Sequence, residues 1–472
     1  MNDHSMESFR RLEQARRSAS PAQSQSLFFS PEGKAQTFGD VLKDVQAYIS
    51  SHYAVLLSAN AGLDAKAQLK RYIGQYVQEN RIAVAGMDQA SLVDALHAEM
   101  AEFGFLTKYI FGTGVEEIDV NSWEDVEVQY GDGRIKKLDE HFDSPAHAVS
   151  VVRRMLHVSG TVLDNASPAA LGHLSKNIRI ATMKNPLVDE DAAVAASIRI
   201  VNPQNLTRDD FIHSGTATDD MLFFLSECLR YGVSMCVAGP PSSGKTTLLG
   251  WLLTTIPDRK RIFTIESGSR ELSEVRRDAN GKIRNSVIHT LTRDSDDPRQ
   301  RITQTNLLDM ALRFNPDYIA VGEMRSDEAN AGQEASRTGI AVLTTIHAIS
   351  CQAAYSRMVT LCKRAVETAD STLYGYVTEA FPLSIYCKRL ENGQRRVMEI
   401  MECEILPDGT RNFRTLFQYD ITENHIVDDR FIINGSHRAV RGISPSLQRR
   451  FLQNGMPRDT LNRIIQMGGE AA

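Results

Sequence analysis

The sequence lacks several features that would place it in other classes of protein. None of its six cysteines forms a C-x-x-C pair, which disfavours zinc and redox sites and predicts free, mostly buried thiols in a reducing compartment. No apolar run is long enough to span a membrane, and the N-terminus has no apolar signal core, so we expect a cytoplasmic protein. The net charge of −6 gives no electrostatic reason to expect nucleic acid or a general attraction to anionic lipid.

What is present is typical of a soluble multidomain chain. Apolar residues make up 42% of the 472 residues and charged residues 24%, which is ordinary for a globular protein. A chain of this length is too long for a single core, so several domains are expected.

One glycine-rich loop carries most of the chemical information. The segment GPPSSGKTT, residues 239–247, fits the phosphate-binding pattern G-x-x-x-x-G-K-[ST]. An apolar run at 233–238 predicts a strand before it, and residues 247–253 predict a helix after it. In that context Lys245 would reach the β- and γ-phosphates, and the Thr246 hydroxyl would bind Mg²⁺. We therefore predict an ATP site formed by Gly239, Ser242, Ser243, Gly244, Lys245, Thr246 and Thr247.

Three later strands are predicted to end in residues that suit this chemistry. The segment NPDYIAVGEMR, residues 315–325, is an apolar strand followed by Glu323, which could polarise the attacking water. Glu266 ends the strand TIE and could hold Mg²⁺ through water, and His347 follows the strand LTTI, where it could contact the γ-phosphate. Each residue alone could equally be a solvated acid or a structural histidine, and the P-loop favours the catalytic interpretation.

With Glu266, Glu323 and His347 in this order after a P-loop, residues 100–400 resemble the secretion ATPase superfamily. That superfamily serves type II and type IV secretion, type IV pili and tight-adherence pili. The matching segments are GPPSSGKTT (Walker A), TIES (Asp box), NPDYIAVGEMR (Walker B) and TTIHA (His box). Two positions depart from the family pattern: Gly322 replaces the usual strand-end aspartate, and Ser267 replaces the aspartate of the Asp box. Glu271 or Glu274 could compensate for the second.

The resemblance implies a homohexameric ring, in which each chain has an N-terminal domain and a RecA-like motor domain with ATP and Mg²⁺ between them. It implies that Glu323 is the catalytic acid and that Arg179, Arg199 and Arg293 complete the site. An arginine that stabilises the transferring phosphoryl group is physically sound, although each of these arginines could instead be a surface charge.

Within the superfamily the chain most resembles the tight-adherence branch. The similar segments are residues 114–121, 197–200 and 207–210, together with extra helices before residue 108; the four-cysteine zinc insertion of type II motors is absent. The resemblance implies a motor at the inner face of the cell membrane that acts on a pilus platform protein in that membrane. This platform protein would add pilin subunits to the pilus or take them out. Membrane association would come only through partner proteins, and no nucleic acid is expected. The alternatives are a type IV secretion or conjugation motor, a RecA-type nucleic-acid translocase, and a ring that binds nucleotide without hydrolysis.

We therefore predict an α/β protein in which a small α/β domain with a helical extension precedes a RecA-like domain. The expected order is a disordered tail (1–36), a three-helix extension (37–108), the N-terminal α/β domain (109–203), a linker (204–214), the motor domain (215–385) and a C-terminal appendage (386–472).

Overall fold

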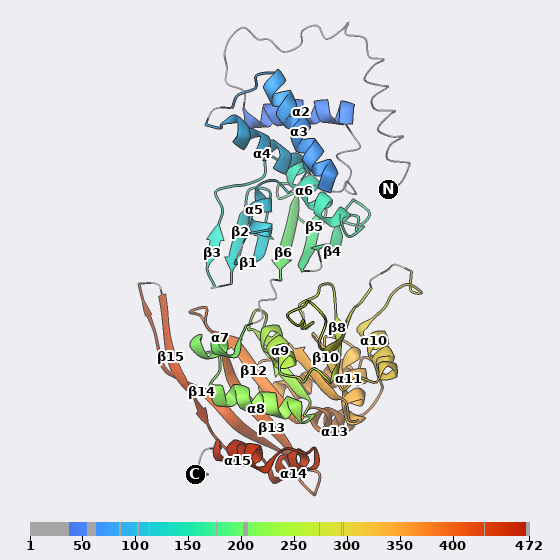
Figure 1. Ribbon diagram of the computed structural model, residues 1–472, viewed down its shortest axis with the longest axis vertical. Coiled ribbons are helices and arrows are strands. Elements are labelled where there is room, and N and C mark those ends of the chain that lie inside the picture. The colour runs from blue at the N-terminus through green and yellow to red at the C-terminus, as the bar shows by residue number, and fades with distance from the viewer. Residues whose placement is uncertain are drawn as a thin grey trace. The chain divides into compact units, whose positions relative to one another are not determined.

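The computed structural model describes residues 37–468, apart from residues 54–62, 85, 102, 113, 132, 176, 202–205, 273, 294, 296 and 429. The chain divides into two compact units, residues 1–101 and 102–472, which are described separately (Figure 1). The tail expected at residues 1–36 lies outside the described residues.

The described part of the first unit is helical. It contains α2 (Phe38–Tyr53), α3 (Leu63–Glu79) and α4 (Gln89–Ala101). Apolar residues at helical spacing meet in one small core, formed by Val41, Leu42, Val45, Ile49, Leu69, Ile73, Val77, Leu92 and Leu96. The three helices predicted in this region are therefore confirmed.

The second unit begins with an antiparallel sheet. Short helical turns η2 (Gly104–Leu106) and α5 (Thr107–Ile110) precede it. Its strands run in the order β3-β2-β1-β6-β5-β4. Their bounds are β1 (Val115–Val120), β2 (Val126–Tyr130), β3 (Ile135–Lys137), β4 (Ala169–Ser175), β5 (Ile178–Lys184) and β6 (Val194–Ile200). Helix α6 (Pro145–His157) packs its apolar side into the same core as the sheet. Strand β4 was not predicted from the sequence.

The second sheet has nine strands in the order β15-β14-β13-β12-β7-β11-β10-β8-β9. The six strands from β12 to β9 are parallel, and β13, β14 and β15 continue the sheet antiparallel. Their bounds are β7 (Met235–Ala238), β8 (Arg261–Glu266), β9 (Ser286–Leu291), β10 (Tyr318–Val321), β11 (Ala341–Ile346), β12 (Leu383–Arg389), β13 (Arg395–Ile405), β14 (Arg411–Val427) and β15 (Arg430–Ala439). The mainly parallel sheet confirms the predicted α/β class.

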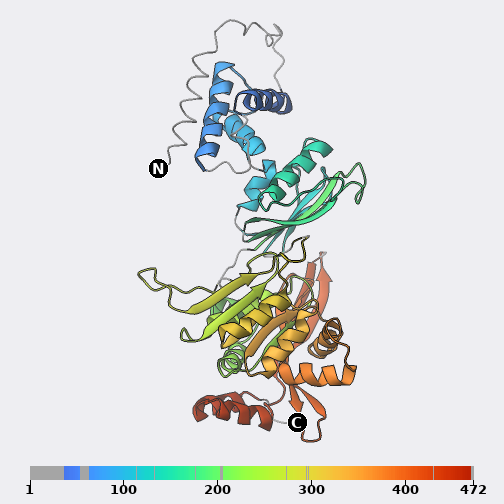
Figure 2. The same ribbon diagram turned by 90° about the vertical axis from the view of Figure 1, so that its right-hand side faces the viewer.

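Helices cover both faces of this sheet because alternate strand residues point to opposite sides (Figures 1 and 2). Met235 and Val237 join one core, whereas Cys236 and Ala238 join the other. The first core includes α7 (Arg208–His213), α8 (Asp219–Arg230), α9 (Lys245–Thr254), α14 (Pro445–Gln453) and α15 (Arg458–Gln466). The second includes α10 (Gln304–Ala311), α11 (Glu328–Arg337), α12 (Cys351–Cys362) and α13 (Asp370–Ala380), with the turn η3 (Leu312–Phe314) after α10.

Three further observations bear on the sequence-based expectations. The segment expected to be a linker contains helix α7, which Thr207 and Asp210 cap through a reciprocal capping box. All six cysteines are free and buried, as expected. Among the described residues, no helix combines the length and apolarity that crossing a membrane requires.

Candidate nucleotide site

The glycine-rich loop connects strand β7 to helix α9, which is the context that phosphate binding needs. Gly244 has a left-handed φ of +89°, and helix α9 begins directly after it. A Cβ atom at Gly239 would lie 2.3 Å from the Cys387 carbonyl oxygen, so only glycine fits there. Residues 241–247, which form the end of the loop and the start of α9, line one cavity, and the N-terminus of a helix suits the binding of an anion there.

Lys245 is buried at the first position of α9. Its Nζ donates a hydrogen bond of 2.7 Å to the Pro240 carbonyl oxygen within the loop. Burial lowers the pKa of this ammonium. Phosphate oxygens would give the buried ammonium charged hydrogen-bond acceptors in addition to the Pro240 carbonyl oxygen.

The ends of three parallel strands bring the predicted acids and histidine together. Strands β8, β10 and β11 pair in parallel register, with Val321 opposite both Ile265 and Thr344. Glu266, Glu323 and His347 consequently lie at one edge of the sheet, where they line the same cavity as the P-loop.

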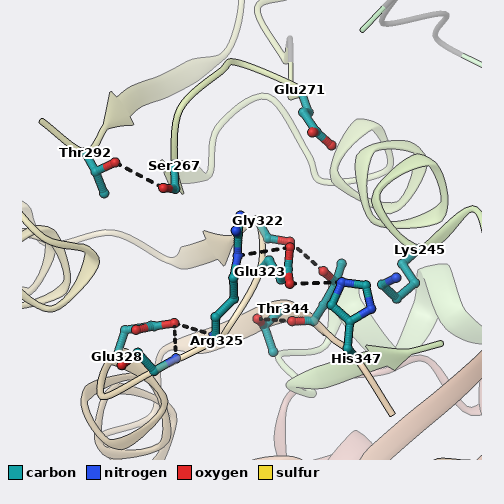
Figure 3. Close-up of polar contacts among 12 residues, drawn as sticks. Lys245, Ser267, Glu271, Thr292, Gly322, Glu323, Arg325, Glu328, Thr344 and His347 are labelled. Atoms are coloured by element: carbon teal, nitrogen blue, oxygen red, sulfur yellow. Dashed lines mark hydrogen bonds and ion pairs between the residues drawn. The ribbon is translucent and has the colours of Figure 1, made fainter. Parts of the chain in front are cut away.

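Glu323 and His347 are in direct contact (Figure 3). Nε2 of His347 is 3.1 Å from Oε1 of Glu323, and Nδ1 of His347 is 3.2 Å from the Gly239 carbonyl oxygen. Nε of Arg325 lies 3.2 Å from the other Glu323 oxygen. The Glu323 carboxylate is therefore held between His347 and Arg325, next to the P-loop. Arg325 lies in the NPDYIAVGEMR segment, yet sequence reasoning assigned it no role.

Glu266 is buried, and only one of its two carboxylate oxygens has a hydrogen-bond partner. Its Oε1 accepts hydrogen bonds from the backbone N–H groups of Glu271 (2.6 Å) and Leu272 (2.9 Å), while its Oε2 is buried with no partner. Burial raises the pKa of Glu266 to about 7. The hydroxyls of Ser243 and Ser269, which both line the same cavity, are also buried without a partner. Buried polar atoms are normally hydrogen-bonded, so these orphaned atoms fit a site for a polar ligand with a cation.

Two of the three predicted arginines reach this cavity. Arg179 on β5 donates to Oε1 of Glu271 (2.8 Å) and to the Ser267 carbonyl oxygen (3.2 Å). Arg199 lies opposite Arg179 on β6, with Nη2 at 3.9 Å from the same Glu271 oxygen. Arg293, in contrast, is exposed, donates to Gln300, and does not line the cavity. Its expected contribution to the site stays a prediction.

Ser267, which stands in place of the Asp-box aspartate, is held by two polar contacts. The Ser267 hydroxyl accepts a hydrogen bond of 3.3 Å from Thr292, and its carbonyl oxygen is bound by Arg179. Glu271 is engaged by Arg179, and Glu274 is buried with its pKa raised by burial to about 8. Both glutamates line the cavity, so either can approach a ligand there.

The cavity that these residues line has a volume of about 650 Å³, within the usual range for a small-molecule site. Of the P-loop residues predicted from the sequence, Ser242, Ser243, Gly244, Lys245, Thr246 and Thr247 line it, whereas Gly239 does not. Apolar side chains line another part of it, among them Leu206, Phe211 and Trp251. A phosphate cradle joined to an apolar pocket suits a nucleotide. Arg395, which no motif indicated, also lines the cavity.

Comparison with known proteins gives a family match. The type II/IV secretion system protein family matches residues 169–406, just over half of the chain. An uncharacterized protein of Methanocaldococcus jannaschii is 32% identical over 200 residues, which cover 42% of this chain and 34% of that protein. The type IV secretion system protein VirB11 of Bartonella henselae is 31% identical over 194 residues, covering 39% of this chain and 50% of the relative. The chain thus spans about half or less of the length of these relatives.

A solved structure, that of the Legionella pneumophila ATPase DotB, is also similar. The sequences are 16% identical, the TM-score is 0.44, and the match covers 76% of this chain and 85% of DotB.

Proposed function

Because the chain belongs to the type II/IV secretion system protein family, we propose that it is a Mg²⁺-dependent ATPase that powers a secretion or pilus machine. The observation that carries this proposal is the convergence of Lys245, Glu323 and Arg179 on one cavity. Each of these residue types has a separate role in phosphoryl transfer, and all three roles require the side chains to face one substrate.

The roles follow from the contacts. Lys245 binds the β- and γ-phosphates in place of the Pro240 carbonyl oxygen. Glu323 orients the attacking water and accepts its proton, while His347 holds the carboxylate in place. Arg179 and Arg199 stabilise the charge on the transferring phosphoryl group. To do so they move away from the Glu271 carboxylate, which both approach in this structure.

The P-loop and the Asp box supply the groups for the cation. Thr246 and Glu266 are the residues that would hold Mg²⁺, with the orphaned Glu266 oxygen as the available acceptor. A bound Mg²⁺ would supply positive charge that offsets the negative charge of the phosphates. To hold the cation Glu266 would have to be deprotonated, and burial raises its pKa to about 7.

We further propose that the chain works as a homohexamer at the inner face of the cell membrane, attached there through a platform protein that assembles a tight-adherence pilus. Residues 114–121, 197–200 and 207–210 and the helices α2, α3 and α4 support this branch of the family. The proposed functional domains are residues 109–203 and 215–385, with the appendage 386–472.

A type IV secretion motor is the second candidate. The observation that favours it is the 31% identity to a VirB11 protein whose name places it in a type IV secretion system. The two candidates share every residue of the site, so purification of the chain with its membrane partner is the experiment that separates them. A pilus platform protein in the complex supports the first, and secretion-channel components support the second.

The test of the ATPase proposal is steady-state hydrolysis with Mg²⁺, comparing wild type with Glu323→Gln on protein whose mass is measured in the same run. We expect a hexamer that hydrolyses ATP, and a variant that binds ATP but hydrolyses it at least about tenfold more slowly. Binding without hydrolysis by the wild type would contradict the proposal and favour a ring that only binds nucleotide. Stimulation by single-stranded DNA would favour a nucleic-acid translocase.

A further inference from the structure

Arg395, at the start of β13, contacts the P-loop through the Ser242 carbonyl oxygen. We propose that Arg395, the first residue of β13, is a positioning residue that holds this loop and couples its conformation to the β1–β6 sheet. The proposal deepens the ATPase function proposed above and rests on it.

The Arg395 guanidinium uses all three of its nitrogen atoms. Its Nε donates to the Ser242 carbonyl oxygen at 3.0 Å, inside the P-loop. Its Nη1 donates to the Gly131 carbonyl oxygen at 3.2 Å, and its Nη2 lies 3.0 Å from a Glu116 carboxylate oxygen. One side chain therefore binds the P-loop and two segments of the first sheet at once.

The contact with Ser242 acts on the orientation of a peptide group. Ser242 has a φ of +56°, a left-handed conformation that is uncommon for serine and needs support from its surroundings. In a trans peptide the C=O and the following N–H point in opposite directions. By holding the Ser242 oxygen, Arg395 fixes the direction of the Ser243 N–H, one of the donors that a P-loop offers to phosphate.

Residues next to Arg395 on β13 and at the end of β12 make similar contacts. Nη2 of Arg389, at the end of β12, donates to the Gly133 carbonyl oxygen at 3.1 Å. On β13, Nη1 of Arg396 donates to the Ser214 carbonyl oxygen at 2.9 Å, and the Val397 N–H donates to the Thr216 oxygen at 2.9 Å. The adjoining ends of β12 and β13 thus contact the β2–β3 connection and the chain that follows α7. A displacement of either segment changes the position of Arg395 and, through it, the P-loop.

Arginine is the side chain that this geometry requires. Its planar group offers five donors in a fixed fork, whereas a lysine offers one compact charge. Lysine at this position could keep one of the three contacts, but it would no longer connect the P-loop to Gly131 and Glu116. We therefore expect Arg395→Lys to behave as an intermediate between wild type and Arg395→Ala.

The experiment measures ADP affinity and the kcat and KM for ATP in the full-length protein. The variants are Arg395→Ala, Arg395→Lys, Glu116→Ala and the Arg395→Ala/Glu116→Ala double variant. The matched control is Arg414→Ala. Arg414 is equally exposed (26% of its side chain, as for Arg395) and pairs with Glu404 at 2.8 Å, but it does not line the cavity.

We expect Arg395→Ala to weaken ADP binding about tenfold, the usual scale for one lost charge-assisted hydrogen bond. Its kcat should fall as well, with partial rescue in Arg395→Lys. Glu116→Ala should lower kcat while leaving ADP affinity within about twofold, since the Ser242 contact remains. The double variant should resemble Arg395→Ala, because the two residues act through one contact.

Several results would overturn the proposal. If Arg395→Ala has the same ADP affinity and kcat as the control Arg414→Ala, Arg395 has no positioning role. If the effects of Arg395→Ala and Glu116→Ala are additive, the two residues are not coupled. If Arg395→Ala fails to fold, Arg395→Lys and Glu116→Ala decide the question by the same measurements. A wild type that binds ADP but hydrolyses no ATP defeats the ATPase proposal, whereas the ADP-affinity comparison still decides the role of Arg395.

Discussion

Nε2 of His347 lies 3.1 Å from Oε1 of Glu323, while Nδ1 of the same ring lies 3.2 Å from the Gly239 carbonyl oxygen. Both partners are acceptors when Glu323 is ionised, so both contacts are hydrogen bonds only for a doubly protonated ring. Burial and the nearby Lys245 ammonium lower the pKa of His347. The neutral ring that results can donate either to the P-loop or to Glu323.

This arrangement predicts that His347→Ala lowers kcat about tenfold with little change in the KM for ATP. The reason is that Glu323 loses the partner that orients it, while the phosphate-binding groups stay in place. Steady-state kinetics measures this. His425→Ala is the matched control, because His425 also approaches a glutamate (Glu423, 3.5 Å) but lies on β14, away from the cavity. Equal kcat values for the two variants would contradict the role of His347.

Lys245→Ala should abolish nucleotide binding or weaken it at least about tenfold, because the ammonium is the charge that the P-loop brings to the phosphates. Binding of a fluorescent ADP analogue at equilibrium measures this without any need for turnover. Lys260→Ala is the control: Lys260 pairs with Asp317 at 2.6 Å and lies outside the cavity. Unchanged affinity in Lys245→Ala would mean that the P-loop assignment is wrong.

Arg179→Ala should lower kcat about tenfold or more while ADP binding changes little, since the arginine acts on the charge of the γ-phosphoryl group. Arg199→Ala should have a smaller effect, because Arg199 is more exposed and only approaches Glu271. Single-turnover hydrolysis compared with ADP affinity separates the two effects. The control is Arg284→Ala, which removes a surface ion pair with Asp258 at 2.8 Å. Full turnover in both variants, Arg179→Ala and Arg199→Ala, would refute the assignment of these arginines.

The raised pKa of the Glu274 carboxyl predicts that the stability of the folded chain depends on pH. Burial raises its pKa from 4.5 to about 8, so the folded chain binds more protons than the unfolded chain between these pH values. The free energy of unfolding therefore falls as the pH rises through this window. We expect Glu274→Gln to be more stable than wild type by roughly 4 kcal/mol at pH 8 and about equal to it near pH 4.5, at about 1.4 kcal/mol per pKa unit.

Urea unfolding at the two pH values, without nucleotide, tests this expectation. Glu379→Gln is the control, because Glu379 is an exposed glutamate that pairs with Arg337 at 3.0 Å. If wild type and Glu274→Gln lose the same free energy between pH 4.5 and pH 8, Glu274 is not the group responsible.

Much of the site could be predicted from short segments. The loop from Gly239 to Thr246 is continuous, and its strand, turn and helix follow from neighbouring residues. The strand-end positions of Glu266, Glu323 and His347 were also predictable, because parallel strands end at one edge of a sheet. These features depend on local backbone geometry and on hydrophobic pattern, both of which the amino-acid order encodes directly.

The contacts between distant segments could not be predicted in this way. Glu271 is 92 positions from Arg179, and Arg395 is 153 positions from Ser242, with no motif that relates either pair. The nine-stranded sheet places β13 near the P-loop, and the β5–β6 register places Arg179 opposite Arg199.

The sequence by itself therefore determined the family, the phosphate-binding loop and the acids at the strand ends. Only the tertiary structure decided which arginines meet those groups, that Arg293 does not line the cavity of its own chain, and that Arg395 bridges the loop to the first sheet. The physical reason is that local conformation depends on adjacent residues, whereas side chains far apart in sequence meet only where the packing of the sheets brings them together.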